Sequence, residues 1–164
     1  RNQWINRMCD YLNTGFKAEN VTSLVNQITS RIEIEVNRDR ERWQDSMLYI
    51  QKGERIKWIK DYAIKRPQFI REHIIDYFEL ENGISDIQVV QNINMGHVKI
   101  NSIEIKESFW TGKYIENIPI QIEAIPNEGY VFEKWKSQRI PQEPLITVKT
   151  KKNKKFIPIF KKIE

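Results

Sequence analysis

The hydrophobic periodicity changes at Gly83, and this change constrains the fold more than any other feature of the sequence. Before Gly83 the apolar residues recur at the spacing of amphipathic helices. After it they alternate with polar residues, which is typical of half-buried strands. The chain has 164 residues, enough for one ordinary domain or two small ones. We therefore expect an α+β fold, with a helical subdomain at 1–82 and a small all-β module at 86–164.

Four helices are predicted before Gly83. The first carries apolar residues at helical spacing up to Leu12 and is expected to stop at Gly15. Asn20 or Thr22 is expected to cap the second helix, whose apolar stripe extends to residue 36. Residues 32–36 also alternate like a strand, but the helical period continues through them and favours helix.

The third predicted helix begins after Gly53, and the fourth covers the apolar residues 70–78. Pro67 lies between them and is expected to separate them, because proline disfavours helical backbone at the preceding residue. The same proline suits the first turn of the helix that follows it.

The second half predicts short strands joined by turns. The clearest strand covers 118–124, where apolar and polar residues alternate strictly. Residues 126–129 contain proline and glycine and predict the next turn. Residues 145–148 and 156–160 are expected to form a closing hairpin, with Pro158 on an edge strand or at a bulge.

Charge and cysteine content narrow the functional class. The net charge is +5, and most basic residues have acidic neighbours, which favours a solvated mixed surface over a nucleic-acid partner. The exception is 149–155, with five lysines and no acid, which we interpret as a solvated hairpin. Cys9 is the only cysteine, so it forms no disulfide within the chain and supports no cysteine zinc site. We interpret it as core filling.

Nothing in the sequence predicts a membrane span, because no apolar run is long enough to cross a bilayer. The first residue is Arg1 rather than methionine. We interpret the chain as a fragment or a processed product, from which a leader could have been lost.

Residues suited to chemistry are few. His73 shares a helix stripe with apolar residues and is expected to be packed, whereas His97 follows a turn glycine and is expected to be exposed. Metal-ligand spacing, a nucleophile elbow and a glycine-rich phosphate loop are all missing from the sequence. The carboxylates are interpreted as solvated charges. The sequence therefore predicts no catalytic, cofactor-binding or metal-binding residue.

Aromatic residues outside the simple core pattern are the remaining site candidates. Trp58, Trp110 and Tyr114 are predicted to contact either a ligand or the other lobe. A row of such rings on a sheet can stack on sugars or grip a peptide. Burial of Trp58 and Trp110 in a seam between lobes is the favoured interpretation, because small lobes need apolar area to dock.

The first half resembles the C-terminal helical end of the CotH kinase-like family, named for a spore-coat protein. Three segments carry the resemblance: residues 4–16, which read Trp-Ile-Asn-Arg and then Tyr-Leu-Asn-Thr-Gly-Phe; residues 38–43, which end in Trp43; and residues 59–78, which contain the Arg66-Pro67 pair. The family usually has a histidine in the run before that tryptophan, and this chain has none.

The second half is similar to the divergent internalin-B-type bacterial repeat over most of 86–162. The shared pattern is an aromatic-Gly turn, a strand ending in Ala-x-Pro, a Gly-Tyr-x-Phe-x-x-Trp segment and a closing strand ending in phenylalanine. In this chain these elements are residues 110–114, 124–126, 129–135 and 157–160. Such modules commonly follow CotH-like domains in exported bacterial proteins.

Together the two resemblances imply a function. The CotH-like family implies an atypical kinase-like fold that uses ATP and Mg²⁺, but its nucleotide- and metal-binding motifs match no residue here. The chain is therefore expected to be a non-catalytic C-terminal part of an exported or cell-surface CotH-like protein, with a structural or adhesive role. Its implied partner is the upstream kinase-like domain of the same protein.

Two alternatives remain open at this point. The β half could bind a glycan or a cell-surface protein through its exposed aromatic residues. The chain could also be part of an active kinase whose catalytic residues lie upstream.

Overall fold

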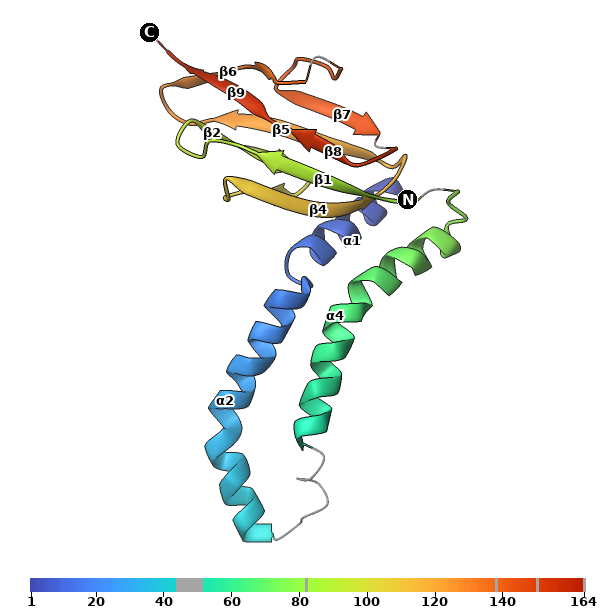
Figure 1. Cartoon of the computed structure of the whole chain (residues 1–164), viewed down its shortest axis with the longest axis vertical. Helices are drawn as coiled ribbons and strands as arrows, with labels where there is room; N and C mark the ends of the chain where they lie inside the picture. Colours follow the sequence, from blue (N-terminus) through green and yellow to red (C-terminus); the bar gives the residue numbers. More distant parts are fainter. Residues whose placement is uncertain (44–51, 82, 138, 150, 164) are drawn as a thin grey trace. The chain divides into compact units, whose positions relative to one another are not determined.

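A computed structural model describes residues 1–43, 52–81, 83–137, 139–149 and 151–163 (Figure 1). Within these residues three helices precede a region of small sheets, which confirms the α+β class. The helices are α1 (Asn2–Asn13), α2 (Ala18–Trp43) and α4 (Lys52–Tyr77). The strands are β1 (Ile84–Val90), β2 (Gly96–Ile100), β3 (Ile103–Glu104), β4 (Phe109–Ile115), β5 (Pro119–Pro126), β6 (Tyr130–Trp135), β7 (Leu145–Lys149), β8 (Lys154–Phe156) and β9 (Pro158–Lys162).

The extent of the helices follows the spacing of their apolar residues more closely than the positions of proline. Residues 32–36 are helical, as predicted, and α1 ends just before the turn that contains Gly15. The predicted break at Pro67 is wrong, because α4 runs through it. Proline removes one backbone hydrogen bond from a helix. The buried positions Ala63 and Ile74 lie on either side of it at helical spacing, so one continuous apolar face favours one helix.

The predicted start of the second helix is also wrong. Helix α2 begins at Ala18, so neither Asn20 nor Thr22 is its cap. The Thr22 hydroxyl instead donates to the Ala18 carbonyl within the helix at 2.8 Å. The Asn20 side chain donates back to the Thr14 carbonyl at 2.7 Å, which ties the preceding turn to the helix.

The strands form three small sheets with the orders β4-β1-β8, β3-β2-β5-β7 and β6-β9. The predicted closing hairpin is wrong: β7 pairs with β5, whereas β8 pairs in parallel with β1. Residues 149–155 therefore connect two sheets, and residue 150 lies outside the described residues. Pro158 is the first residue of β9, which pairs with β6 alone among the described strands, so the prediction of an edge strand is confirmed. The first position of a strand tolerates a missing N–H.

The core of the sheets comes from alternating side chains, as the period predicted. Ile120, Ile122 and Ala124 on β5 are all buried. Trp135 is 1% exposed, and its indole lies edge-on to Phe156, with ring centroids 6.1 Å apart. Its Nε1 donates to the Glu143 carbonyl at 2.9 Å, so the buried ring has a partner for its only polar group.

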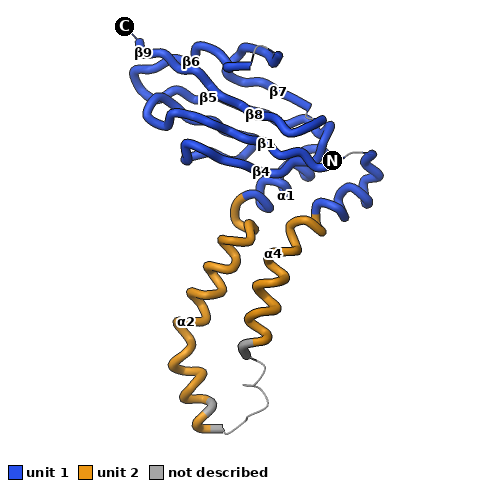
Figure 2. Tube along the Cα trace, viewed as in Figure 1, with its two compact units in different colours: residues 1–13, 71–164 blue, residues 14–70 orange. Residues whose placement is uncertain are grey.

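Contacts divide the chain into two compact units (Figure 2). Unit 1 consists of residues 1–13 and 71–164, and unit 2 of residues 14–70. Helix α1 therefore belongs with the sheets, where it packs on β4. Strand β1 begins directly after Gly83, where the sequence period changes. The assignment of 1–82 and 86–164 to two family segments stays a prediction. No helix in the described ranges combines the length and apolarity needed to cross a bilayer.

Candidate functional site

Helix α1 presents two parallel stripes to the sheets of unit 1. The apolar stripe consists of Ile5, Cys9 and Leu12, all buried. A polar stripe repeats the same spacing one residue later and consists of Asn6, Asp10 and Asn13. Asp10 and Asn13 are also buried, at 3% and 7% exposure. Buried polar side chains need hydrogen-bond partners, so this stripe must meet polar groups on the sheets.

Asn13 binds the backbone of β4 as a neighbouring strand would. Its Nδ2 donates to the Lys113 carbonyl at 3.0 Å, and its Oδ1 accepts from the Lys113 amide at 2.9 Å. The same Oδ1 accepts from the buried Arg71 guanidinium at 2.8 Å. Strand β4 is the outer strand of its sheet, so the carboxamide satisfies groups that an open edge would leave available for pairing.

Asp10 is the centre of the polar contacts on α1. Its carboxylate accepts from the Tyr114 hydroxyl at 2.8 Å and from the Ser102 hydroxyl at 2.5 Å. It also accepts from the Ser102 amide at 3.2 Å and from the Asn101 carboxamide at 3.4 Å. These four donors replace the water that a buried carboxylate loses, and they join α1 to two places in the sheets.

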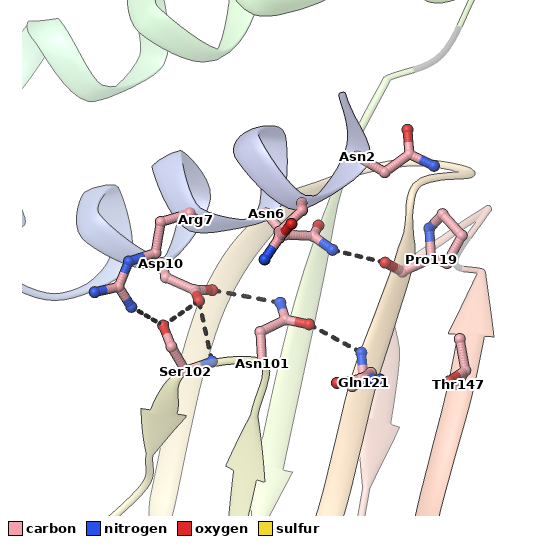
Figure 3. A pocket seen from close by; sticks show the side chains of 10 residues that line it. Asn2, Asn6, Arg7, Asp10, Asn101, Ser102, Pro119, Gln121 and Thr147 are labelled. Carbon is pink, nitrogen blue, oxygen red and sulfur yellow. Dashed lines mark hydrogen bonds between the residues drawn. The ribbon is translucent and has the colours of Figure 1, made fainter.

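A polar cavity of about 690 Å³ lies beside this stripe (Figure 3). Its walls come from α1, the turn between β2 and β3, β5 and β7. The lining residues are Asn2, Gln3, Asn6, Arg7, Asp10, Asn101, Ser102, Pro119, Gln121 and Thr147. Seven of these ten side chains are neutral carboxamides or hydroxyls, so the cavity offers many neutral hydrogen-bonding groups beside the aliphatic parts of its lining.

Internal hydrogen bonds hold the walls of the cavity in place. The Asn6 carboxamide donates to the Pro119 carbonyl at 2.7 Å. The Asn101 side-chain oxygen accepts from the backbone amide of Gln121 at 2.9 Å. Arg7 donates to the Ser102 hydroxyl and, at 3.1 Å, to the Tyr11 hydroxyl, and its guanidinium lies 4.6 Å from the centre of the Tyr11 ring.

The buried titratable groups near α1 are not poised for catalysis. Burial raises the pKa of the Cys9 thiol to about 11, although the nearby Arg71 opposes the shift. Burial also raises the pKa of Tyr114 well above its usual value, and the Asp10 charge adds to this effect. Both groups therefore stay protonated at neutral pH, and a protonated thiol is a poor nucleophile. The arrangement supports docking rather than covalent chemistry.

The three aromatic candidates lie in different environments. Tyr114 is fully buried and donates to Asp10, so it offers no surface on which a sugar could stack. Trp110 is half-buried on the same face of β4, close above Gly112. Trp58, on α4 in unit 2, is 69% exposed, and its predicted contact with a ligand or with the other lobe stays a prediction. The structure thus brings Trp110 and Tyr114 onto the face of β4 that meets α1.

The two histidine expectations are wrong. His73 is exposed, because the neighbouring Ile74 takes the buried position on that turn of α4. His97 is half-buried on β2. The expected core-filling role of Cys9 is confirmed by its complete burial.

Sequence reasoning missed the polar stripe of α1. The available signal was the repetition of Asn6, Asp10 and Asn13 at the spacing of the apolar stripe, one residue out of phase. Polar residues at these positions would ordinarily indicate a solvated helix face. Only the position of α1 on β4 shows that they are buried.

Comparison with known proteins relates the first part of the chain to a family. Residues 1–70 match the family model described as CotH kinase protein, which supports the CotH-like part of the prediction. No curated protein and no solved structure matches the chain. The matched segment contains α1, α2 and most of α4. The first 70 of the 164 residues are thus similar to the CotH kinase protein family.

Proposed function

We propose that this chain is the non-catalytic C-terminal part of an exported or cell-surface CotH-like protein, in which it has a structural or adhesive role. Its helices cover the upstream kinase-like domain, and its β region is a divergent internalin-B-type repeat module docked on α1. ATP and Mg²⁺ are assigned to the upstream domain, because the family motifs that hold them match no residue here.

The observation that carries this proposal is the exposure of apolar side chains on unit 2. Helix α2 has Leu24, Ile28 and Ile32 in one stripe at four-residue spacing, 55%, 50% and 48% exposed. Helix α4 has a second set, Trp58, Ile59 and Tyr62, at 69%, 50% and 61%. Contiguous apolar surface of this kind normally marks an interaction site.

The family match favours one occupant for these two stripes. Both lie inside residues 1–70, the segment similar to the CotH kinase protein family. The rest of such a domain is a partner that would share a core with these helices. The polar contacts of α1 with β4 then hold the β region to the same domain.

The proposal is tested by expressing the kinase-like domain encoded upstream of Arg1 and measuring its binding to this chain. Ile28→Asp places a charge in the α2 stripe and is expected to weaken binding by about a hundredfold, because an apolar contact is lost and a charge is buried. Ser30→Asp is the matched control. It introduces the same charge two residues along α2, about 200° around the helix axis, and is expected to leave binding unchanged.

Equal weakening by both variants, or no binding by the unmodified chain, contradicts the proposal. So does an upstream reading frame without a kinase-like domain. Calorimetry with Mg-ATP tests the non-catalytic assignment separately. No saturable heat is expected from this chain alone, and a saturable magnesium-dependent signal contradicts the assignment.

A further inference from the structure

The polar cavity beside α1 is a built site that the proposed function does not use. Four separate segments of unit 1 supply its walls, and hydrogen bonds between those segments fix their positions (Figure 3). Its volume of about 690 Å³ lies within the usual range of small-molecule sites. The lining side chains therefore decide which class of molecule it suits.

The charged side chains of the lining already hydrogen-bond to protein groups. The two charged side chains of the lining are Arg7 and Asp10. The Asp10 carboxylate accepts four hydrogen bonds from protein donors, and Arg7 donates to Ser102 and Tyr11. Both charged side chains therefore have protein partners, and the seven neutral carboxamide and hydroxyl side chains, which form most of the lining, match a neutral molecule.

The neutral side chains on the wall of β5 and β7 are the groups that a ligand would meet. Gln121 and Thr147 lie directly opposite each other on the two strands, and both are exposed. Neither side chain hydrogen-bonds within the described part of the chain. Asn2 and Gln3 line the opposite wall on α1. A carboxamide both donates and accepts, and so does a hydroxyl, so this set matches a ligand with many hydroxyl groups.

The lining residues also favour a saccharide over a peptide as the ligand. A bound peptide segment would need apolar subsites for its side chains, and specific recognition of peptides uses such pockets. Pro119 is the one apolar residue among those that line the cavity. Sugar hydroxyls, by contrast, match the carboxamides and hydroxyls of the remaining lining.

We propose that this cavity binds a short neutral saccharide, held chiefly through Gln121 and Thr147 on one wall and the N-terminal carboxamides of α1 on the other. The site differs from a stacking platform of exposed aromatic rings. It uses neither helix stripe of unit 2, so its failure leaves the proposed function standing, and the reverse also holds.

The test is titration of the ¹⁵N-labelled full chain with maltotriose, cellotriose and mannotriose in separate NMR experiments. At least one of these is expected to give saturable shifts of the backbone amides of Ser102, Gln121 and Thr147. The double variant Q121A/T147A is expected to weaken that binding by about tenfold or more, because each neutral hydrogen bond is worth roughly three- to tenfold in affinity.

The chain provides a closely matched control. Gln88 and Thr111 also form a Gln–Thr pair directly opposite each other on antiparallel strands, in the β1–β4 ladder outside the cavity. The variant Q88A/T111A therefore makes the same chemical change elsewhere and is expected to bind like the unmodified chain. Trigalacturonate and an acetylated, amidated trialanine serve as charged and peptide probes.

Three outcomes overturn the proposal. The first is that none of the neutral trisaccharides gives saturable shifts at the cavity. The second is that both double variants weaken binding equally. The third is that the trialanine or the charged sugar binds there and the neutral sugars do not. Selective loss in Q121A/T147A with binding retained in Q88A/T111A supports it.

Discussion

The two compact units differ in how far they bury tryptophan and isoleucine side chains. Trp135 in unit 1 is 1% exposed and hydrogen-bonded through its indole, whereas Trp58 in unit 2 is 69% exposed. Ile120 and Ile122 of β5 are buried, whereas Ile28 and Ile32 of α2 are about half exposed. The β-rich unit with α1 therefore contains a closed core. Within the described residues of unit 2, the helices carry apolar side chains that are about half exposed or more.

The largest expected effect comes from replacing one tryptophan in each unit by alanine. Trp135→Ala is expected to lower the free energy of unfolding by about 4 kcal/mol, because it empties the centre of the core and leaves the Glu143 carbonyl without its donor. Trp58→Ala is expected to change it by less than about 0.5 kcal/mol, because the indole is largely in water. Urea unfolding followed by circular dichroism measures both. A comparable loss in the two variants contradicts the division into a closed and an open unit.

Local patterns explain which parts of the fold were predictable. The alternation of Ile120, Ile122 and Ala124 specified a half-buried strand, and that strand is present. The helical period of α2 outweighed the alternation at 32–36. These signals are properties of neighbouring residues. The pairing of β8 with β1 was not predictable in this way, because it joins residues far apart in the sequence.

The same distinction applies to the candidate site. Asp10 and Tyr114 are 104 residues apart, and only the packing of α1 on β4 brings them together. From sequence alone Tyr114 looked like an exposed ring and Asp10 like a solvated charge. The turn that contains Asn101 and Ser102 likewise reaches Asp10 only after the sheets have formed. A single sequence records none of these long-range contacts.

A smaller effect is expected from adding one methyl group to a glycine in each unit. At Gly112 a new Cβ would lie 2.7 Å from Trp110 Cζ2 and 3.0 Å from Asn13 Nδ2. Gly112→Ala must therefore displace a rigid ring or the carboxamide bound to β4, and it is expected to cost about 2 kcal/mol.

Gly15 is the matched position in unit 2. A Cβ there meets nothing within 4 Å, and the residue does not have a positive φ. Gly15→Ala is expected to raise stability by about 0.5 kcal/mol, because it restricts the unfolded chain. Thermal and urea unfolding measure both variants. A harmless Gly112→Ala would show that α1 is not tightly docked on β4.

The smallest effect is a loss of stability in alkaline solution that originates at Cys9. Burial raises the pKa of this thiol from 9.0 to about 11. Because the folded pKa is the higher one, the contribution is fully present below pH 9 and is lost as the pH rises toward 11. At pH 10 the thiol is mostly ionised when unfolded and mostly protonated when folded. This difference lowers the free energy of unfolding by about 1 kcal/mol relative to pH 8.

Cys9→Ala isolates this contribution, since it removes the titrating group and leaves Tyr114 in place. The variant is less stable at every pH because it leaves a cavity, so the informative quantity is the change between pH 8 and pH 10. That change is expected to be smaller than in the unmodified chain by about 1 kcal/mol. Tyr114, whose pKa is also raised by burial, is present in both proteins, so its contribution cancels in this comparison. An identical change in both proteins would mean that α1 admits water at Cys9, and the closed character assigned to unit 1 would then not extend to its helix.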